Sequence, residues 1–330
     1  MVIHPTRAIY GIVGFFCLGF DKLKNLWTNL SLADKIGILL IIGFGCSASF
    51  SQRSGWDYIA AFRADTLAGV TARHTWNPYP TYWLIYPFAI MPERVGFFFW
   101  NLVNAICFIY AIYYWRGNFL GFSLSLPLFW TYYSGQMEGF ISLGIVLGLS
   151  QSPLLAGFGL ALLTIKPQLG ILPVLFILYR RRDWQLLIVP VLIYGASFLY
   201  WGWWIPQWLY DLHGKGDASV IFPTNISLFP YSLILLSLLW WTRKSLKAWL
   251  LIESLVITYF PVYSLAVVFC LEIPTWANVF LWLVYISANF IQYPTVTWLP
   301  YTAIPGFLIP VGMLGKELLD LNRSSRSVAL

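Results

Sequence analysis

The sequence predicts an all-α protein, a polytopic bundle of membrane helices. Hydrophobic residues make up 59% of the 330 residues and charged residues only 10%, whereas a soluble chain is roughly 45–50% apolar and about 25% charged. Aromatic residues make up 19%, and such rings gather at the boundary between lipid and water. The apolar residues form about 10–13 hydrophobic segments, the pattern of a chain that crosses a bilayer many times.

Several of these segments are shorter than the ~20 residues of a straight span. Proline is frequent where we place their junctions, as at Pro87, Pro127, Pro167 and Pro173. Broken helices are tolerated in a bilayer only where protein or a watery cavity satisfies the freed backbone groups. We therefore expect a compact bundle with an internal polar cavity open to one face.

Lys and Arg residues predict the orientation, because they concentrate on the cytoplasmic side. Most of the 20 lie in the N-terminal segment, at Arg116, at Arg180–Arg182, in residues 243–247 and in the tail from Lys316. The loops 51–80 and 204–226 then face outward. Residues 248–271 form either one kinked span or two short ones, and two are favoured because they keep the basic tail inside.

The chain divides into an interfacial or cytoplasmic N-terminal segment (1–35), an integral membrane domain (36–315) and a cytoplasmic tail (316–330). Residues 8–20 are apolar and lack a following signal-peptide cleavage site. As a helix they cover only about 20 Å of the ~30 Å hydrocarbon core. They are expected to form an interfacial or re-entrant helix.

No motif points to a cofactor, a metal or a nucleic acid. The four cysteines lie in apolar runs without a CxxC or His-Cys spacing, so they are expected to be small buried side chains. No Walker motif or GxGxxG loop appears. The +7 formal charge comes from short basic clusters between apolar runs, which are topology signals. An enzyme of this kind would take its activated substrate from the membrane.

The polar segment 51–80 interrupts this apolar chain with two acids, three arginines and a histidine. It is longer than most passive loops, and a membrane protein that gathers such residues at one face is usually forming a site there. Asp57 is either a helix N-cap or a general base near the bilayer surface. Asp65 would share its face if residues 57–68 are helical.

Two further features interrupt the apolar runs. Lys166, followed by Pro167, either reaches outward to the lipid headgroups or binds a lipid phosphate at the mouth of the cavity. Gly135-Gln136 is a turn, and Glu138 follows it as a helix-start acid. His213, in the sequence HGKGD, is expected to be a solvated loop residue.

Taken in order, these features resemble glycosyltransferase family 87, membrane mannosyltransferases of the GT-C type that use polyprenyl-phosphate mannose. The resemblance covers roughly residues 36–290. It is carried by GWDYIAAFRA, WNPYPTYWLIYPFAIMP, SGQMEGFISLGIVLGLSQSPLLAGFGLALLTIKPQLGILPVLFILYRRRDW, TNISLF and ITYFPVYSL. Glu138 departs from the pattern, because the family usually has an apolar or amide residue there.

The resemblance implies a GT-C-like fold and inverting transfer of a sugar, expected to be mannose, at the non-cytoplasmic face of the cell or plasma membrane. The partners are a polyprenyl-phosphate sugar donor, a lipid or glycan acceptor and membrane lipids. The leaving phosphate needs a cation and the acceptor hydroxyl needs a carboxylate base. The expected catalytic acids are Asp57, first, and Asp65. The expected phosphate-binding residues are Lys166, Arg63, Arg73 and His74, and the expected substrate-binding residues are Trp56, Trp76, Tyr79, Gln136 and Asn225.

The competing interpretation is a transporter or lipid flippase without transferase activity. That class predicts internal repeats and charges near mid-membrane in both halves of the chain. The sequence has no such repeat, and its ionisable residues gather at one face. The pattern therefore favours an enzyme.

Overall fold

The computed structural model of the chain describes residues 27–72, 75–220, 225–290 and 299–327. The described residues are mainly helical, and their only β-type pairing is an isolated bridge between Asn225 and Pro261. The predicted all-α class is confirmed. The expected interfacial helix at 8–20 lies outside the described residues.

The helices follow one another along the chain with short connections. Their bounds are α3 Leu32–Ala48, η1 Trp56–Arg63, α4 Ala64–Ala68, α5 Thr81–Ala89, α6 Glu93–Trp115, α7 Phe119–Ser123, α8 Leu126–Ser134, α9 Glu138–Gly148, α10 Pro153–Thr164, α11 Pro167–Arg181, η2 Trp184–Leu187, α12 Ile188–Trp201, α13 Ile205–Val220, η3 Tyr231–Leu239, α14 Leu246–Val256, η4 Val262–Ser264, α15 Leu265–Phe269, α16 Thr275–Phe290 and α17 Leu299–Ser327. Here η1 is a π-helix, and η2, η3 and η4 are 3₁₀-helices.

Within the described ranges, two helical stretches are long and apolar enough to cross a bilayer, namely α6 and the continuous η2–α12 stretch Trp184–Trp201. Other apolar helices, such as α9 and α10, are shorter. Much of α12 exposes large apolar side chains, including Val191, Leu192 and Leu199. Contiguous apolar surface of this kind marks a face that contacts lipid or protein.

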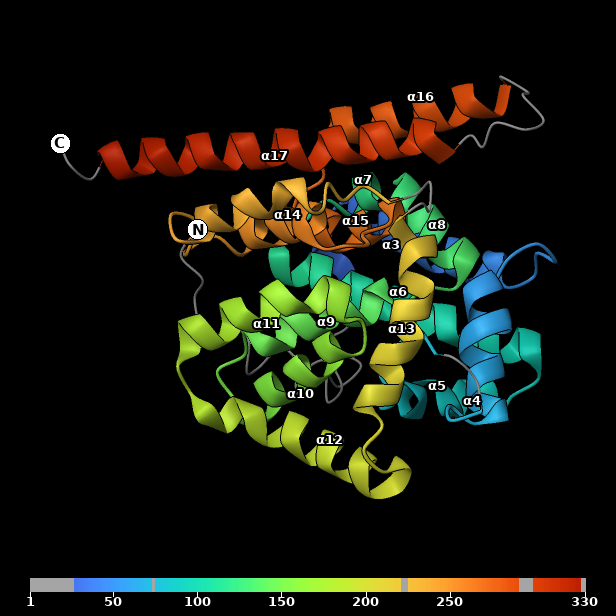
Figure 1. Cartoon of the computed structure of the whole chain (residues 1–330). Coiled ribbons are helices and arrows are strands. Elements are labelled where there is room, and N and C mark those ends of the chain that lie inside the picture. The colour runs from blue at the N-terminus through green and yellow to red at the C-terminus, as the bar shows by residue number, and fades with distance from the viewer. Residues whose placement is uncertain (1–26, 73–74, 221–224, 291–298, 328–330) are drawn as a thin grey trace.

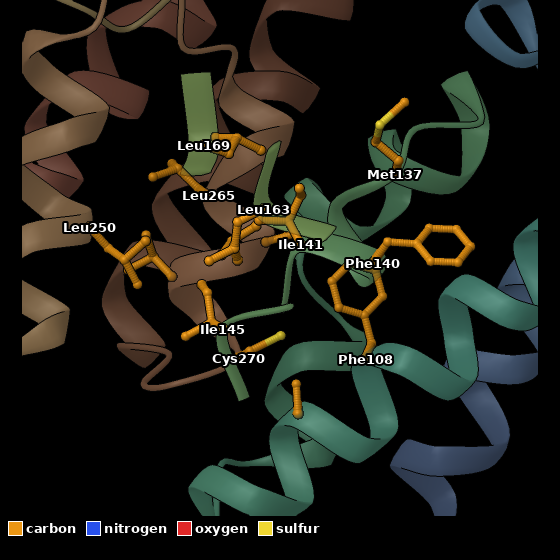
Figure 2. Packing of buried hydrophobic residues seen from close by; sticks show 14 of the residues in the cluster. Phe108, Met137, Phe140, Ile141, Ile145, Leu163, Leu169, Leu250, Leu265 and Cys270 are labelled. Carbon is orange, nitrogen blue, oxygen red and sulfur yellow. The ribbon is translucent and has the colours of Figure 1, made fainter. Parts of the chain in front are cut away.

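The helices surround a continuous apolar core. Helix α17 runs along one side of the molecule against α14 and α16, and α12 lies on the other side next to α10 (Figure 1). Between them, α6, α9, α10, α11, α14 and α15 contribute most of the buried side chains labelled in Figure 2, among them Phe108, Ile141, Leu163 and Leu250.

Small residues let α9 and α10 pack backbone to backbone. A Cβ atom added at Gly159 would lie 2.2 Å from the Gly148 nitrogen and 2.6 Å from the Gly144 carbonyl oxygen. Glycine is therefore required at this crossing, as at many helix contacts in membranes. The tight crossing fixes the start of α9, which carries Glu138, relative to the end of α10, which leads to Lys166.

The chain reverses direction within residues 246–272. Helix α14 leads to the short helices η4 and α15. Lys247, at the start of α14, contacts Glu272, which follows the end of α15, at 2.7 Å. This agrees with two short segments rather than one kinked span in 248–271. Ser264, near the reversal, therefore lies at the end of this hairpin opposite to Lys247.

Proline positions correct part of the sequence analysis. Pro127 and Pro167 lie in the first turn of α8 and α11, where proline lacks only an amide that is unpaired anyway. Pro87 and Pro173, expected at junctions, instead lie inside α5 and α11. Next to Pro173, Glu253 Oε1 accepts a hydrogen bond from the Leu172 amide at 2.9 Å.

Candidate functional site

Two glycines in the left-handed region bring distant segments together. Gly55 (φ 83°) precedes η1, and its amide donates to the Tyr133 carbonyl at 2.6 Å. Gly135 (φ 79°) ends α8, and a Cβ atom there would lie 2.6 Å from the Tyr58 Cβ. Only glycine fits such positions without strain. The start of η1 is thereby held against the turn that follows α8.

Aromatic packing fixes η1 in place. Tyr58 is fully buried and stacks on Phe97 and Trp100, with ring centroids 5.3 and 5.7 Å apart. Trp100 in turn donates from its indole nitrogen to the Gly135 carbonyl at 2.9 Å. Asp57, next to Tyr58, is half-buried and lies in the first turn of this π-helix. Such wide turns occur frequently at functional sites.

A hydrogen-bonded chain of polar side chains starts at Asp57. Gln136 Nε2 donates to Asp57 Oδ2 at 2.5 Å, and Lys166 Nζ donates to Gln136 Oε1 at 2.9 Å. The same ammonium lies 2.5 Å from Glu138 Oε1, which also accepts a hydrogen bond from Ser264 at 2.9 Å. We call these residues the Asp57–Ser264 network: Asp57, Gln136, Glu138, Lys166 and Ser264.

The network is buried at its centre. Glu138 is 0% exposed and Lys166 is 3% exposed. Lys166 lies just before Pro167 at the start of α11, and its ammonium lies 4.9 Å from the centre of the Tyr263 ring. The ammonium therefore points into the protein rather than toward exposed surface. Pairing with Glu138 and the aromatic face replace the water that it loses.

The network contains two carboxylates and one ammonium. The protein around the Asp57 carboxyl raises its pKa, and the Glu138 charge adds to that rise. The hydrogen bond from Gln136 and the charge of Lys166 act in the opposite direction, but the pKa of Asp57 remains above its ordinary value. A carboxylate of raised pKa accepts a proton more readily, which suits general base chemistry.

The second predicted acid, Asp65, lies in α4 and is buried. Residues 56–68 are helical, and their first part is a π-helix. The Tyr82 hydroxyl of α5 donates to Asp65 Oδ2 at 3.3 Å. Asp65 thus ties η1–α4 to α5.

The predicted phosphate-binding residues are spread out. Arg63 contacts the Met91 carbonyl at 3.5 Å, at the turn between α5 and α6. Arg73 and His74 lie outside the described residues. Lys166 is the only one of the four that the structure places in the Asp57–Ser264 network, as far as residues are described.

The predicted substrate-binding residues differ from one another in exposure and in the groups that they contact. Trp56 and Trp76 are partly exposed, with Trp56 at 67%. Tyr79 is buried and stacks on Trp204 at 4.9 Å. Among the described residues, the side chain of Asn225 bonds only to backbone groups, donating to the Thr258 carbonyl and accepting from the Ser227 and Phe260 amides. In this structure Tyr79 and Asn225 hold segments together, whereas Gln136 belongs to the network.

Sequence analysis missed the roles of two residues of the network. Glu138 does begin α9, as expected of a helix-start acid, but its carboxylate also pairs with Lys166. Ser264 carries no local signal, because a serine in an apolar run is common. The described residues contain no group of three or more His, Cys, Asp or Glu side chains that could hold a metal ion.

Comparison with known proteins gives one match. The family model described as Glycosyltransferase family 87 matches residues 76–304, well over half of the chain. The matched stretch includes Gln136, Glu138, Lys166 and Ser264, whereas Asp57 precedes it. No curated protein and no solved structure matches.

Proposed function

Because this chain belongs to glycosyltransferase family 87, we propose that it transfers mannose from a polyprenyl-phosphate donor to a lipid or glycan acceptor with inversion. Membership makes the chain a glycosyltransferase, which sets aside the transporter alternative. The sugar, the donor and the acceptor are our proposal. The observation that carries it is the link from Asp57 through Gln136 to Lys166, which joins a base to a cation.

Asp57 is the proposed general base. As the acceptor oxygen attacks the anomeric carbon, its proton passes to the Asp57 carboxylate. The bond between the anomeric carbon and the phosphate oxygen breaks in the same step, so one displacement inverts the configuration. Gln136 donates to one carboxylate oxygen and so holds the base in one orientation.

Lys166 is the proposed cation for the leaving phosphate. That group departs with its negative charge, so a fixed ammonium stabilises it without any proton transfer. In the described structure Glu138 and Gln136 hold the ammonium in place. A fixed position costs no reorganisation during the reaction.

We further propose that the protein is a multi-pass membrane protein with its site at the non-cytoplasmic face. The two long apolar stretches and the exposed apolar surface of α12 support this. Gln52, exposed at the end that carries Asp57, and Lys244, exposed before α14, offer a matched pair for labelling. An impermeant thiol reagent on intact cells should modify Gln52→Cys and not Lys244→Cys, and the reverse result would invert the orientation.

The activity itself is tested with purified protein, labelled polyprenyl-phosphate mannose and a membrane lipid extract. We expect a labelled product, and polyprenyl-phosphate glucose under the same conditions gives the control for the sugar. Label transferred only from the glucose donor would overturn mannose but not transfer. No labelled product from either donor, with folded protein, would contradict the proposed reaction.

A further inference from the structure

We propose that Glu138 is a positioning residue for the transfer step: it holds the Lys166 ammonium against the Gln136 carbonyl and thereby makes Gln136 donate to Asp57. This inference rests on the proposed function of Asp57. The family match covers Glu138 but assigns a role to no individual residue.

The first step in the argument is that Glu138 fixes Lys166. Its Oε1 atom lies 2.5 Å from the ammonium and accepts a second hydrogen bond, from Ser264, at 2.9 Å. The side chains of both members of the pair are almost completely buried. A buried ammonium is stable only when it is paired and hydrogen-bonded. Without Glu138, the described partners of this ammonium are the neutral Gln136 amide and the Tyr263 ring.

The second step is that Lys166 fixes the direction of the Gln136 amide. An ammonium is only a donor, so the oxygen of the amide must face Lys166. The nitrogen must then face Asp57, whose carboxylate is only an acceptor when ionised. The opposite orientation would place two donors together at Lys166 and two acceptors together at Asp57. Only one orientation of Gln136 therefore satisfies both neighbours.

The third step links the geometry to the charge at Asp57. The groups that face Asp57 are Gln136 from the turn after α8, Glu138 from α9, Lys166 from the start of α11 and Tyr263 from η4. Among these, Glu138 raises the pKa of Asp57 and Lys166 lowers it. The Gln136 hydrogen bond and the Lys166 charge lower that pKa, and each acts more strongly than the Glu138 charge. Loss of Glu138 that frees Lys166 and Gln136 from their positions therefore raises the pKa of Asp57, whereas loss of the Glu138 charge alone would lower it.

If Glu138 forms only a structural ion pair, its loss has different effects from the loss of a positioning residue. Loss of a purely structural pair lowers thermal stability and, through the missing charge alone, moves the acidic limb of the pH–rate profile to lower pH. Loss of a positioning residue lowers the transfer rate and moves the acidic limb to higher pH. The two possibilities separate in a pH profile, which stability alone would not move.

The test compares Glu138→Gln with Glu253→Gln in purified full-length protein, using labelled polyprenyl-phosphate mannose. Glu253 is the matched control, because it is also a buried glutamate and bonds to the backbone of α11 rather than to the network. Glu138→Gln is expected to lower the rate constant by roughly ten- to a hundredfold and to move the acidic limb to higher pH. Glu253→Gln is expected to leave the limb in place.

A third variant keeps the test decisive if Glu138→Gln does not fold. Ser264→Ala removes one hydrogen bond to Glu138 and no charge, and it should lower the rate by roughly two- to tenfold. With an active wild type, the inference alone is overturned if Ser264→Ala keeps the wild-type rate, or if a folded Glu138→Gln variant keeps that rate or moves the acidic limb to lower pH. A folded wild type that transfers nothing would overturn the proposed function, and this inference with it.

Discussion

Two clusters of charged side chains lie at opposite ends of the hairpin formed by residues 246–272, and they differ in burial and in charge balance. The Asp57–Ser264 network combines two acids with one lysine, and Glu138 and Lys166 at its centre are almost fully buried. The second cluster, the charged clasp, joins Lys247, Lys316, Glu272 and Glu317 at 2.7–2.8 Å. It pairs two acids with two lysines.

A structural role is enough to explain the charged clasp. It joins the start of α14 to Glu272 and to α17, and the side chains of Glu272 and Lys316 are 39% and 62% exposed. Burial by itself would raise the pKa of Glu272, but hydrogen bonds from Lys247 and Lys316 outweigh it and hold that pKa below its ordinary value. In the network, by contrast, burial keeps the pKa of Asp57 raised. Under the proposed mechanism, an excess of acid over base in a buried cluster is therefore the feature that distinguishes the network from the clasp.

The largest expected effect is that of Asp57→Asn. Asparagine keeps the size of aspartate but accepts no proton at neutral pH, and general base catalysis typically contributes about 10²–10⁴-fold. Transfer of labelled mannose should fall by that factor, with an unchanged melting temperature. Asp65→Asn is the matched control, since Asp65 bonds to Tyr82. A near-normal rate for Asp57→Asn would remove Asp57 from the mechanism.

The next effect is that of Lys166→Met, which leaves Glu138 buried without its partner. Breaking a buried pair in this way costs about 3–5 kcal/mol, so the free energy of unfolding should fall on that scale. From the sequence alone we would expect this substitution to leave the fold intact, and the contact with Glu138 changes that expectation. The double variant Lys166→Met/Glu138→Met should recover much of the stability but not the affinity for donor. Full donor affinity in Lys166→Met would assign the phosphate to another cation.

The pH dependence of transfer gives a third test. The base acts when Asp57 is ionised, so activity is present above its pKa and is lost as the pH falls through it. Because that pKa is raised, the acidic limb should lie above the ordinary aspartate value of about 3.9. A pH–rate profile of the wild type measures it, and a limb at or below the ordinary value would show that burial does not control this carboxylate.

The smallest expected effect is that of Glu272→Gln in the clasp. Its partners are partly exposed, and such ion pairs contribute about 0.2–1 kcal/mol. The Glu272 pKa is lowered in the folded protein, so this contribution is present at neutral pH and is lost as the pH falls through the folded pKa. Unfolding measured at pH 7 should show a small loss, with unchanged transfer. A large loss of transfer would mean that the clasp also serves the site.

The sequence predicts the parts of the site better than their assembly. Asp57, Gln136 and Lys166 each interrupt an apolar run, and that alone makes them candidates. Their contact depends on glycine turns at Gly55 and Gly135 and on the tight packing of α9 against α10, which no local pattern encodes. Position in the sequence therefore identifies unusual residues, whereas packing decides which of them meet.

Two residues illustrate what the sequence leaves open. Proline disfavours a helix interior, yet Pro173 lies inside α11, where the carboxylate of Glu253 accepts from the neighbouring amide of Leu172. The side-chain amide of Asn225, a predicted substrate-binding residue, bonds to three backbone groups. In both cases hydrogen bonds to residues distant in the sequence fix the local structure.

The central claim is that Asp57 acts through its connection to Lys166, and Gln136→Met tests it most directly. Methionine fills similar space, removes both hydrogen bonds of the amide and leaves every charge in place. Because the Gln136 hydrogen bond lowers the pKa of Asp57, the account predicts slower transfer with the acidic limb of the pH–rate profile moved to higher pH. A Gln136→Met protein with the wild-type rate and the wild-type limb would contradict it.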